Sequence, residues 1–360
     1  MVRSSYKKED VTILLKDITG LVEPLPAEKR EPLIQKGVHY CEMLPLEYVP
    51  TEKYFSLYKS ALENYSGITA QAAVVCAEKI YRRKNGKPVL VSLARAGTPV
   101  GIILKNYLEK KYNIKVPHYT ISIIRGRGID RNAMKYILER YSPQSIQFVD
   151  GWTGKGAILG TLEKELENFS GVSSELAVLA DPAYITDMCG THDDFLIPSS
   201  CLNSTVSGLI SRTFLRSDII GENDFHGCAY YGELISEDRT YEFIDSVLEK
   251  IDYSLSENDI EKLIRMSSAD ISSEGFGKKE VRKIADDFGI ADINLVKPGI
   301  GETTRVLLRR IPWKILVRDV NDVKYTGHIL RLAEEKNVEV QEYPLECYRA
   351  CGIIRSMADT

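Results

Sequence analysis

The sequence predicts an α/β fold in which helices cover a parallel sheet, followed by a helical extension and a small αβα unit at the C-terminus. Three observations predict it. Short apolar runs alternate with helical patterns from residue 88 to residue 180, and such alternation is typical of parallel sheets. From Glu222 to Glu261 acidic residues outnumber basic ones on helical patterns. The composition changes again near Asp292, where a compact unit begins.

The N-terminal part predicts an arm followed by helices. Prolines break any long element here and indicate an arm packed onto the core; they are Pro24, Pro26, Pro32, Pro45 and Pro50. Apolar residues at three- and four-residue spacing predict helix from Glu52 to Lys84, with a second helix over 69–83.

Four strands are expected in the central part. They cover 88–93, 118–124, 145–150 and 175–180, each a short apolar run of the kind that a buried parallel strand needs. Helices are expected from Thr98, just before Pro99, and over 132–141 and 156–168. Between Thr186 and Ile235 the alternation stops, and Ser, Thr, Asn and Gly become frequent.

The C-terminal unit is expected to hold helices over 302–310 and 325–336, strands over 313–317 and 338–343, and a strand or turn over 352–355. A polar stretch around 267–277 and a short basic helix precede it. We therefore predict a first domain over 1–265, a linker over 266–291 and a second domain over 292–360.

Length and composition exclude several classes of protein. The chain has 360 residues, enough for two domains of ordinary size, and 44% hydrophobic residues exclude wholesale disorder. Its formal net charge of −4 means that any nucleic-acid binding must be local. The 7 cysteines include no Cys-x-x-Cys pair, so neither a disulfide framework nor a zinc ribbon is indicated. With no long apolar run, we expect a cytoplasmic protein that does not contact membranes.

Two loops after predicted strands carry arginine beside small residues. Ala94-Arg95-Ala96-Gly97-Thr98 follows the first strand and suits an anion, although glycine there can serve turn geometry alone. Arg125-Gly126-Arg127-Gly128 follows the second strand. It suits a cationic lid and equally well a solvated turn.

The loop after the third strand is the most informative. Asp150-Gly151-Trp152-Thr153-Gly154-Lys155-Gly156 leads from a buried strand into a helix. The free amides of Thr153 to Gly156 predict a phosphate cradle, and Asp150 is placed for sugar hydroxyls or a metal. A purely structural glycine-rich turn is the alternative.

Together, these three loops resemble those of the type I phosphoribosyltransferases. The resemblance implies that fold, phosphoribosyl pyrophosphate or a related nucleotide as ligand, and Mg²⁺ at Asp150. It assigns pyrophosphate to Arg95, Ala96 and Gly97. It assigns the catalytic hood to Arg125 or Arg127, and the ribose to Asp150. The 5-phosphate falls to Thr153, Gly154, Lys155 and Gly156. The family's second acidic residue is replaced by Gly151 here, which leaves a non-catalytic nucleotide sensor as an alternative to a transferase.

A narrower resemblance covers the chain from about residue 40. The loop around Trp152, the segment Ile197-Pro198-Ser199-Ser200-Cys201-Leu202-Asn203 and Asp224-Phe225-His226-Gly227 are similar to a bacterial family encoded near tellurite-resistance and stress genes. Its members pair a phosphoribosyltransferase-like domain with a C-terminal Pelota-type RNA-binding domain, and they are also labelled StiP-type cysteine proteases. We therefore expect a transferase in a nucleotide- or RNA-related stress response.

The start of the C-terminal unit resembles the L7Ae/Pelota fold. The segment from Pro298 to Arg305 runs into a helix, and Arg309 lies one turn further on. Amides at a helix start bind phosphate, so the resemblance implies RNA binding at Gly301, Glu302, Thr304, Arg305 and Arg309. An ordinary capped helix with a basic face is the alternative, and a homodimer is an open possibility.

The protease label implies a thiol nucleophile with a histidine base and an orienting group. We expect Cys201 with His226 or His192 as the pair. The orienting group would be one of Asn203, Asp193, Asp194 or Asp224. Cys228, two residues from His226, is less favoured than Cys201. A small buried hydrophobic role is the common one for a free cysteine.

Overall fold

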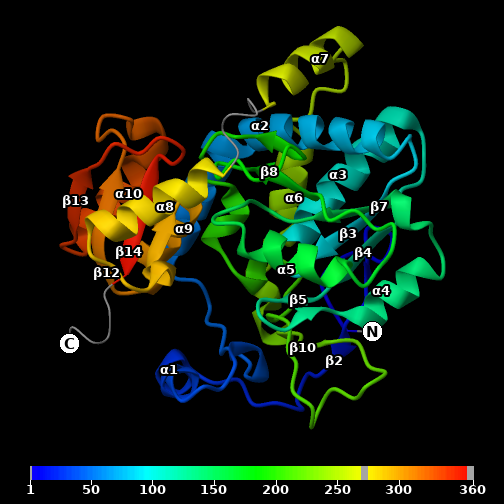
Figure 1. The fold of residues 1–360 in the computed structure, drawn as a ribbon, viewed down its shortest axis with the longest axis horizontal. Helices are drawn as coiled ribbons and strands as arrows, with labels where there is room; N and C mark the ends of the chain where they lie inside the picture. The colour runs from blue at the N-terminus through cyan, green and yellow to red at the C-terminus, as the bar shows by residue number, and fades with distance from the viewer. Residues whose placement is uncertain (1, 269–274, 355–360) are drawn as a thin grey trace.

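The computed structural model describes residues 2–268 and 275–354 and contains a larger domain and a smaller C-terminal domain (Figure 1). The larger domain is built on a six-stranded parallel sheet in the order β1-β4-β3-β7-β8-β9. Its strands are β1 (Thr12–Ile13), β3 (Val89–Leu93), β4 (His118–Ile121), β7 (Ile146–Val149), β8 (Leu176–Ala180) and β9 (Cys189–Thr191). Three of the predicted central strands are thus confirmed as β3, β7 and β8. The strand predicted over 118–124 is divided, because β4 ends at Ile121 and residues 123–124 pair in a separate two-stranded antiparallel sheet. Strands β1 and β9 are additions.

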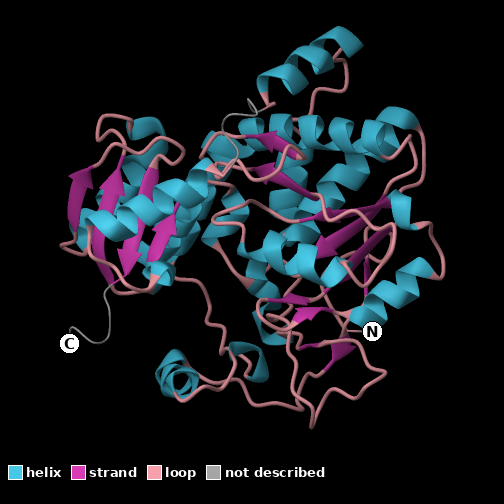
Figure 2. Ribbon diagram, in the orientation of Figure 1, coloured by secondary structure: helices cyan, strands magenta, loops and turns pink. Residues whose placement is uncertain are grey.

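Helices cover both faces of this sheet (Figure 2). Along β3, Leu90 packs into one apolar core whereas Val89 and Val91 pack into the other, as the two-residue alternation of a strand requires. One face is covered by α2 (Glu52–Arg83), α3 (Gly97–Tyr112) and α6 (Thr240–Leu248), and the other by α4 (Arg131–Leu138) and α5 (Ala157–Leu166).

The prediction of two helices before the sheet is wrong, because α2 runs unbroken over 32 residues. No proline lies inside it, and Gly67 has open space around it and does not end the helix. The remaining elements of this part are β2 (Lys16–Asp17), α1 (Ala27–Gln35), β5 (Ile123–Ile124), β6 (Gly128–Ile129), β10 (Gly227–Cys228) and α7 (Glu257–Met266).

The C-terminal domain contains a four-stranded mixed sheet in the order β11-β14-β12-β13. Its strands are β11 (Val296–Pro298), β12 (Pro312–Val317), β13 (Glu339–Glu342) and β14 (Ala350–Ile354), and its helices are α8 (Phe276–Asp287), α9 (Ile300–Arg309) and α10 (Val323–Glu335). Val281 and Ile284 of α8 share an apolar core with Leu316 of β12. The segment expected as a linker therefore contains α8, and part of it lies outside the described residues.

The smaller domain docks on the larger one through a buried carboxylate. Both oxygens of Asp194 accept the backbone N–H of Ile300, at 2.9 and 3.1 Å, and Oδ2 also accepts that of Arg349 at 2.8 Å. Asp194 thereby caps the N-terminus of α9, where a negative charge is favoured. Burial nonetheless raises the pKa of Asp194 to about 6.

The α/β class, the parallel sheet and the small C-terminal domain are as predicted. The finer assignment to the type I phosphoribosyltransferase fold does not follow, because the order β4-β3-β7-β8-β9 is shared by several doubly wound folds. No helix within residues 2–268 and 275–354 has the length and apolar character that crossing a bilayer needs.

Candidate active site

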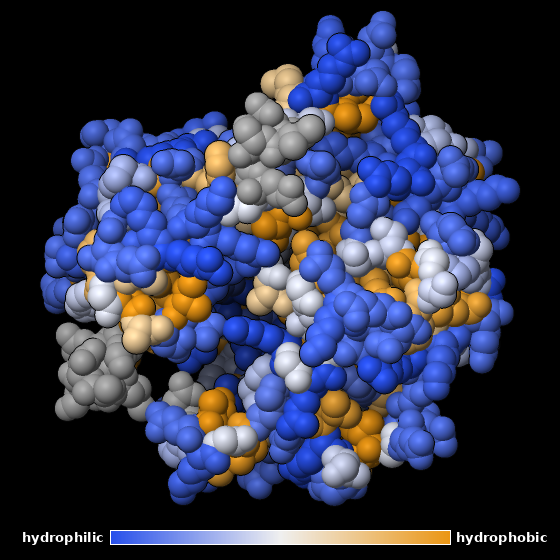
Figure 3. Space-filling view, viewed as in Figure 1, coloured by the Kyte–Doolittle hydropathy of each residue, from blue (hydrophilic) through white to orange (hydrophobic). Residues whose placement is uncertain are grey.

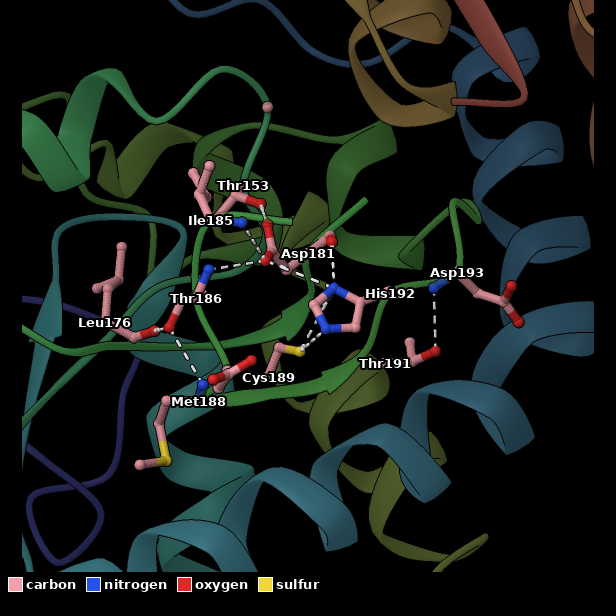
Figure 4. A network of polar contacts seen from close by, with 12 residues as sticks. Thr153, Leu176, Asp181, Ile185, Thr186, Met188, Cys189, Thr191, His192 and Asp193 are labelled. Atoms are coloured by element: carbon pink, nitrogen blue, oxygen red, sulfur yellow. Dashed lines mark hydrogen bonds and ion pairs between the residues drawn. The ribbon is translucent and has the colours of Figure 1, made fainter. Parts of the chain in front are cut away.

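Every cysteine of the chain is free and buried. Within the described residues, two of the thiols lie against a histidine ring. Cys41 Sγ is 2.9 Å from Nδ1 of His39, and Cys189 Sγ is 3.5 Å from Nε2 of His192. The second pair alone has a carboxylate behind its histidine, since Asp181 Oδ2 lies 3.5 Å from Nδ1 of His192. This arrangement is drawn in Figure 4.

The pairing of β8 with β9 assembles the three side chains. Asp181 directly follows β8, Cys189 begins β9, and His192 directly follows β9. The two strands are parallel, with Ala180 opposite Thr191. Their carboxyl ends therefore meet at one edge, where α/β enzymes place their ligands, and Asp181 and His192 come together there.

The turn after β8 holds the carboxylate of Asp181. Its Oδ2 accepts the backbone N–H groups of Ile185 at 2.7 Å and Thr186 at 2.9 Å, and its Oδ1 accepts the hydroxyl of Thr153. Burial raises the pKa of Asp181, and these hydrogen bonds and the neighbouring His192 oppose that rise. The carboxylate is consequently fixed in position at full burial.

The imidazole of His192 is oriented by the same residue. Its Nδ1 lies 2.7 Å from the backbone oxygen of Asp181, so Nδ1 carries the proton and donates it, which leaves a lone pair on Nε2. The sulfur of Cys189 is 3.5 Å from Nε2 and 3.9 Å from Nδ1. These similar distances place it off the axis of either lone pair, and a small rotation of the ring or thiol would align them.

Burial raises the pKa of Cys189, although the charge of Lys79 opposes the rise. The thiol is therefore neutral at rest and needs a base to become a nucleophile. One donor atom each from Asp181, Cys189 and His192 lie within 4.8 Å of one another. Zn²⁺ accepts such a mixture of ligands, so the cluster can either activate a thiol or hold a soft metal.

Aromatic side chains cover the cluster. The ring of Tyr184 stacks on that of His192 with centroids 4.3 Å apart and planes 6° apart, and Phe276 of α8 follows at 6.4 Å. Beside the cluster, a pocket between the domains is lined by Thr153, Ala180, Pro182, Asp194, Ser200 and Gly299, among others. A side chain of the C-terminal domain thus packs on the ring that covers His192.

Two side chains and one amide of the loop expected to hold a 5-phosphate are engaged within the protein, the amide being that of Thr153, which donates to the Ala180 carbonyl at 3.1 Å. Thr153 donates to Asp181, and Lys155 donates to the carbonyls of Ile293 at 2.8 Å and Val296 at 3.0 Å. The carbonyl of Gly154 accepts the hydroxyl of Tyr348 at 2.7 Å. This loop, which continues through Gly156 into α5, secures the two domains to each other.

The arginines of the other two loops also have partners. Arg95 pairs with Glu47 at 2.9 Å and Arg127 with Glu42 at 2.8 Å. Arg125 donates to Asn294 Oδ1 at 2.9 Å. Ala96 and Gly97 lie at the start of α3, and a side chain at Gly97 would come within 2.3 Å of the Val149 carbonyl.

Asp150 stands at the carboxyl end of β7, as expected. Its Oδ1 accepts the backbone N–H of Gly151 at 2.8 Å, and burial raises its pKa to about 6 against the attraction of Arg305. Within the described residues, no second carboxylate completes a metal site with it.

The structure does not bring Cys201 and His226 together. Cys201 ends a buried 3-10 turn, and within residues 2–268 and 275–354 no histidine contacts its sulfur. Burial raises its pKa to about 12. His226 places Nδ1 2.8 Å from Ser122 Oγ and donates its backbone N–H to Asp130 at 2.6 Å.

The residues considered for orienting a catalytic histidine have other roles here. Asp194 caps α9, Asp224 pairs with Lys16 at 2.6 Å, Asp193 lies 3.6 Å from Arg349, and Asn203 accepts from Arg309. The sequence reasoning named His192 but missed Cys189 and Asp181. The available signal was a Cys-Gly-Thr-His stretch that follows an aspartate at the end of a predicted strand.

The predicted RNA contacts at the start of α9 are buried or engaged with other residues of the protein. Gly301 and Thr304 are buried, and Thr304 lies 2.8 Å from Nε2 of His328. Arg305 pairs with Glu302 at 3.3 Å and also donates to the Ser200 carbonyl at 3.3 Å. Arg309 donates to the Cys201 carbonyl at 3.1 Å.

Comparisons with known proteins agree with thiol chemistry in the larger domain. A family described as "Tellurite-like stress resistance cysteine protease StiP" matches residues 4–248, and one described as "PELOTA RNA binding domain" matches residues 276–356. A relative named "Cysteine protease StiP", from Acinetobacter baylyi, is 36% identical over 367 residues that cover 98% of this chain and 94% of the relative.

These matches overturn the prediction of a phosphoribosyltransferase. Both the family and the relative carry the name of a cysteine protease, and neither supports phosphoribosyl pyrophosphate as ligand, whether for a transferase or for a sensor. Mg²⁺ was expected at Asp150 only as part of the binding of phosphoribosyl pyrophosphate, so that expectation loses its basis as well. The chain belongs to the StiP family of tellurite-like stress resistance cysteine proteases.

Proposed function

We propose that this protein is a cysteine peptidase whose nucleophile is Cys189, with His192 as general base and Asp181 as the group that orients it. One observation carries the proposal: among the described residues, this is the cysteine that has a histidine at its sulfur and a carboxylate behind that histidine. The names of the family and of the relative support the reaction class.

The geometry supports a stepwise mechanism. Nε2 of His192 accepts the proton of the Cys189 thiol as the sulfur attacks the carbonyl carbon of a peptide, and a bond forms between sulfur and carbon. The carbon–nitrogen bond then breaks, and the protonated histidine gives its proton to the leaving amine. Water, deprotonated by the same histidine, hydrolyses the thioester and restores the thiol. The Asp181 carboxylate stabilises the imidazolium that forms in each step.

Because the thiol is buried, a substrate must displace the side chains that cover it. Tyr184 lies against one face of His192 and is itself followed by Phe276 of the C-terminal domain. A peptide reaches Cys189 only when the Tyr184 ring moves away. Activity would then depend on how tightly the C-terminal domain holds the loop after β8, where Gly277 donates its N–H to the Ala183 carbonyl at 3.2 Å.

The test compares two cysteine variants in the full-length chain. A proteome-derived peptide library is incubated with wild type, Cys189→Ala or Cys41→Ala, and new termini are identified by mass spectrometry. Cys41 is the matched control because its thiol also contacts a histidine, but Nε2 of that histidine meets the Arg125 carbonyl. We expect cleavage by wild type and Cys41→Ala and none by Cys189→Ala. Cleavage that survives Cys189→Ala, or that depends on Cys41, contradicts the proposal, as does the absence of any cleavage.

We also propose that the C-terminal domain binds RNA. The match of residues 276–356 to an RNA-binding domain supports this second function, as do the arginines of α9. Retention of a labelled RNA by the full-length chain, decreasing with added salt, is the expected result, and no retention at low salt would refute it.

A further inference from the structure

Four arginines from three segments gather between the two domains, and we call them the interdomain arginine cluster: Arg95, Arg212, Arg305 and Arg309. Three of them, Arg95, Arg212 and Arg309, act together to lower the pKa of Glu47 against its burial. Arg305 in turn acts on Arg212 and Arg309. The first two belong to the larger domain and the last two to α9, so the cluster spans the domain boundary.

The neighbouring carboxylates do not neutralise the positive charge of this cluster. Glu47 pairs with Arg95, and Glu302 pairs with Arg305. Among the residues that the structure describes, Arg309 donates only to neutral groups, the Asn203 side chain and the Cys201 carbonyl. Within residues 2–268 and 275–354, the guanidinium of Arg212 forms no hydrogen bond or ion pair, although its backbone carbonyl accepts the hydroxyl of Ser211 at 2.6 Å. Two carboxylates thus face four guanidinium groups, in a chain whose formal net charge is −4.

The unpaired arginine can be reached from solvent. The side chain of Arg212 is exposed, yet burial by surrounding protein lowers its pKa to about 10, and the charges of Arg95, Arg30 and Arg305 add to this effect. A cation that is both accessible and crowded in this way lies in a cleft. Figure 3 shows such a hollow, with hydrophilic residues inside it, where the two domains and the N-terminal arm meet.

A second group of cations lies at the same domain boundary. Burial lowers the pKa of Lys155 to about 8, and the charges of Lys297 and Arg125 contribute. Lys155 and Arg125 belong to the larger domain, whereas Lys297 belongs to β11. An extended anion could contact both groups of cations at once and so relieve the repulsion within each of them.

Aromatic rings accompany the arginines. The guanidinium of Arg305 lies 4.7 Å from the ring centroid of Trp152, and that of Arg309 lies 5.9 Å from that of Tyr54. Both rings are half-buried. A cationic groove with aromatic rings is typical of proteins that bind single-stranded nucleic acids, where the bases stack on the rings.

We propose that single-stranded RNA binds in the cleft between the two domains, with Arg212 of the larger domain contacting its phosphates together with the arginines of α9. The proposal rests on RNA binding by this chain and extends it, because it adds the protease-family domain to the RNA site. The arginines on both sides of the boundary and the rings beside them favour RNA over an acidic peptide, which offers charge without bases.

The test measures binding of a fluorescein-labelled single-stranded RNA of about 20 nucleotides, longer than a typical single-stranded site, by fluorescence anisotropy. Full-length wild type is compared with Arg212→Gln. Arg140→Gln is the control, since Arg140 is an exposed arginine just beyond the end of α4 that rests on Tyr136. We expect Arg212→Gln to weaken binding roughly three- to tenfold and to make the salt dependence shallower by about 0.7 in the log–log slope, the value for one lost phosphate contact. Arg140→Gln should bind as wild type does.

The outcomes separate this proposal from RNA binding in general. If wild type binds RNA and Arg212→Gln binds it equally well with the same salt slope, the cleft is not the site, while RNA binding by the C-terminal domain stands. If wild type binds no RNA, both fail. Competition by polyglutamate as effective as that by unlabelled RNA, at equal charge, identifies a general site for acidic chains and overturns the assignment to RNA.

Discussion

The Sγ atom of Cys189 lies 3.5 Å from Nε2 of His192, whose other ring nitrogen donates to the backbone oxygen of Asp181 at 2.7 Å. The backbone oxygen therefore fixes the tautomer, and the Asp181 carboxylate, 3.5 Å away, adds charge stabilisation. In many catalytic triads one carboxylate does both. Separating the two roles has a measurable consequence.

Replacing the carboxylate should impair peptidase activity less than replacing the histidine. In Asp181→Asn, Nδ1–H keeps its backbone acceptor, so Nε2 keeps its lone pair, and only the stabilisation of the imidazolium is lost. We expect kcat/KM to fall about tenfold to hundredfold in Asp181→Asn and about 100- to 10,000-fold in His192→Ala, the usual size of general base catalysis. Steady-state kinetics on a peptide cleaved by wild type measures both. Equal losses would show that the carboxylate, and not the carbonyl, sets the tautomer.

Removing the ring that covers His192 should expose the thiol. In Tyr184→Ala, the stacked ring 4.3 Å from the imidazole is absent, so a small alkylating reagent can approach Cys189. We expect iodoacetamide to modify Cys189 at least about tenfold faster than in wild type, because access limits the reaction of a buried thiol. Peptide mass spectrometry at each cysteine measures the rates.

Cys76 serves as the internal control for this prediction. It is fully buried under the same sheet, and its thiol donates to the Met188 carbonyl at 3.8 Å. If Cys76 is modified as fast as Cys189, the variant has loosened as a whole, and the idea of a local cover is refuted.

Most of the sheet could be predicted from the sequence, because its strands are fully apolar and short. The bounds of β3, β7 and β8 lie within one residue of the predicted ranges. By contrast, β9 has only three residues, Cys189–Thr191, which carry no periodicity. It forms because it pairs with β8 and packs on α2, and such tertiary contacts have no local signal.

The candidate site was missed for the same reason. The resemblance to a protease family suggested Cys201 and His226, yet Cys201 is enclosed in a turn and His226 meets Ser122. Cys189 and Asp181 meet only through the register of β8 and β9. Likewise, sequence identified the donors Thr153 and Lys155 correctly as polar loop residues, but it could not show that Asp181 and carbonyls of the other domain already occupy them.

The carboxyl group of Asp150 should cost stability at neutral pH. Burial raises its pKa in the folded protein to about 6 from the ordinary 3.8, so the folded state binds the proton more tightly than the unfolded state. The stability that this tighter proton binding gives the folded protein is fully present below pH 3.8 and is lost as the pH rises through about 6. Asp150→Asn keeps the acceptor for the Gly151 N–H and removes the charge. We expect it to be more stable than wild type at pH 7.5, by up to about 3 kcal/mol.

Urea unfolding at pH 7.5 and at pH 4 checks this sign. The extra stability of Asp150→Asn should shrink toward zero at pH 4, where the Asp150 carboxyl group of wild type is largely protonated. A variant that is less stable than wild type at pH 7.5 would mean that the attraction of Arg305 outweighs the effect of burial.

A methyl group at Gly190 should disrupt the site through the backbone. Gly190 follows Cys189 in β9, and a Cβ there would lie 2.1 Å from the backbone oxygen of Ala72 in α2. No rotamer change relieves a clash with a backbone atom, so β9 or α2 must shift and carry Cys189 with it. We expect Gly190→Ala to lose about 3 kcal/mol or more of stability, together with peptidase activity.

Gly160→Ala is the matched control because nothing lies within 4 Å of the position its Cβ would take in α5, and it should gain about 0.5 to 1 kcal/mol of stability. Equilibrium unfolding in urea measures both variants. If Gly190→Ala is as stable and as active as wild type, β9 and α2 are not packed as closely as the Cys189 site requires.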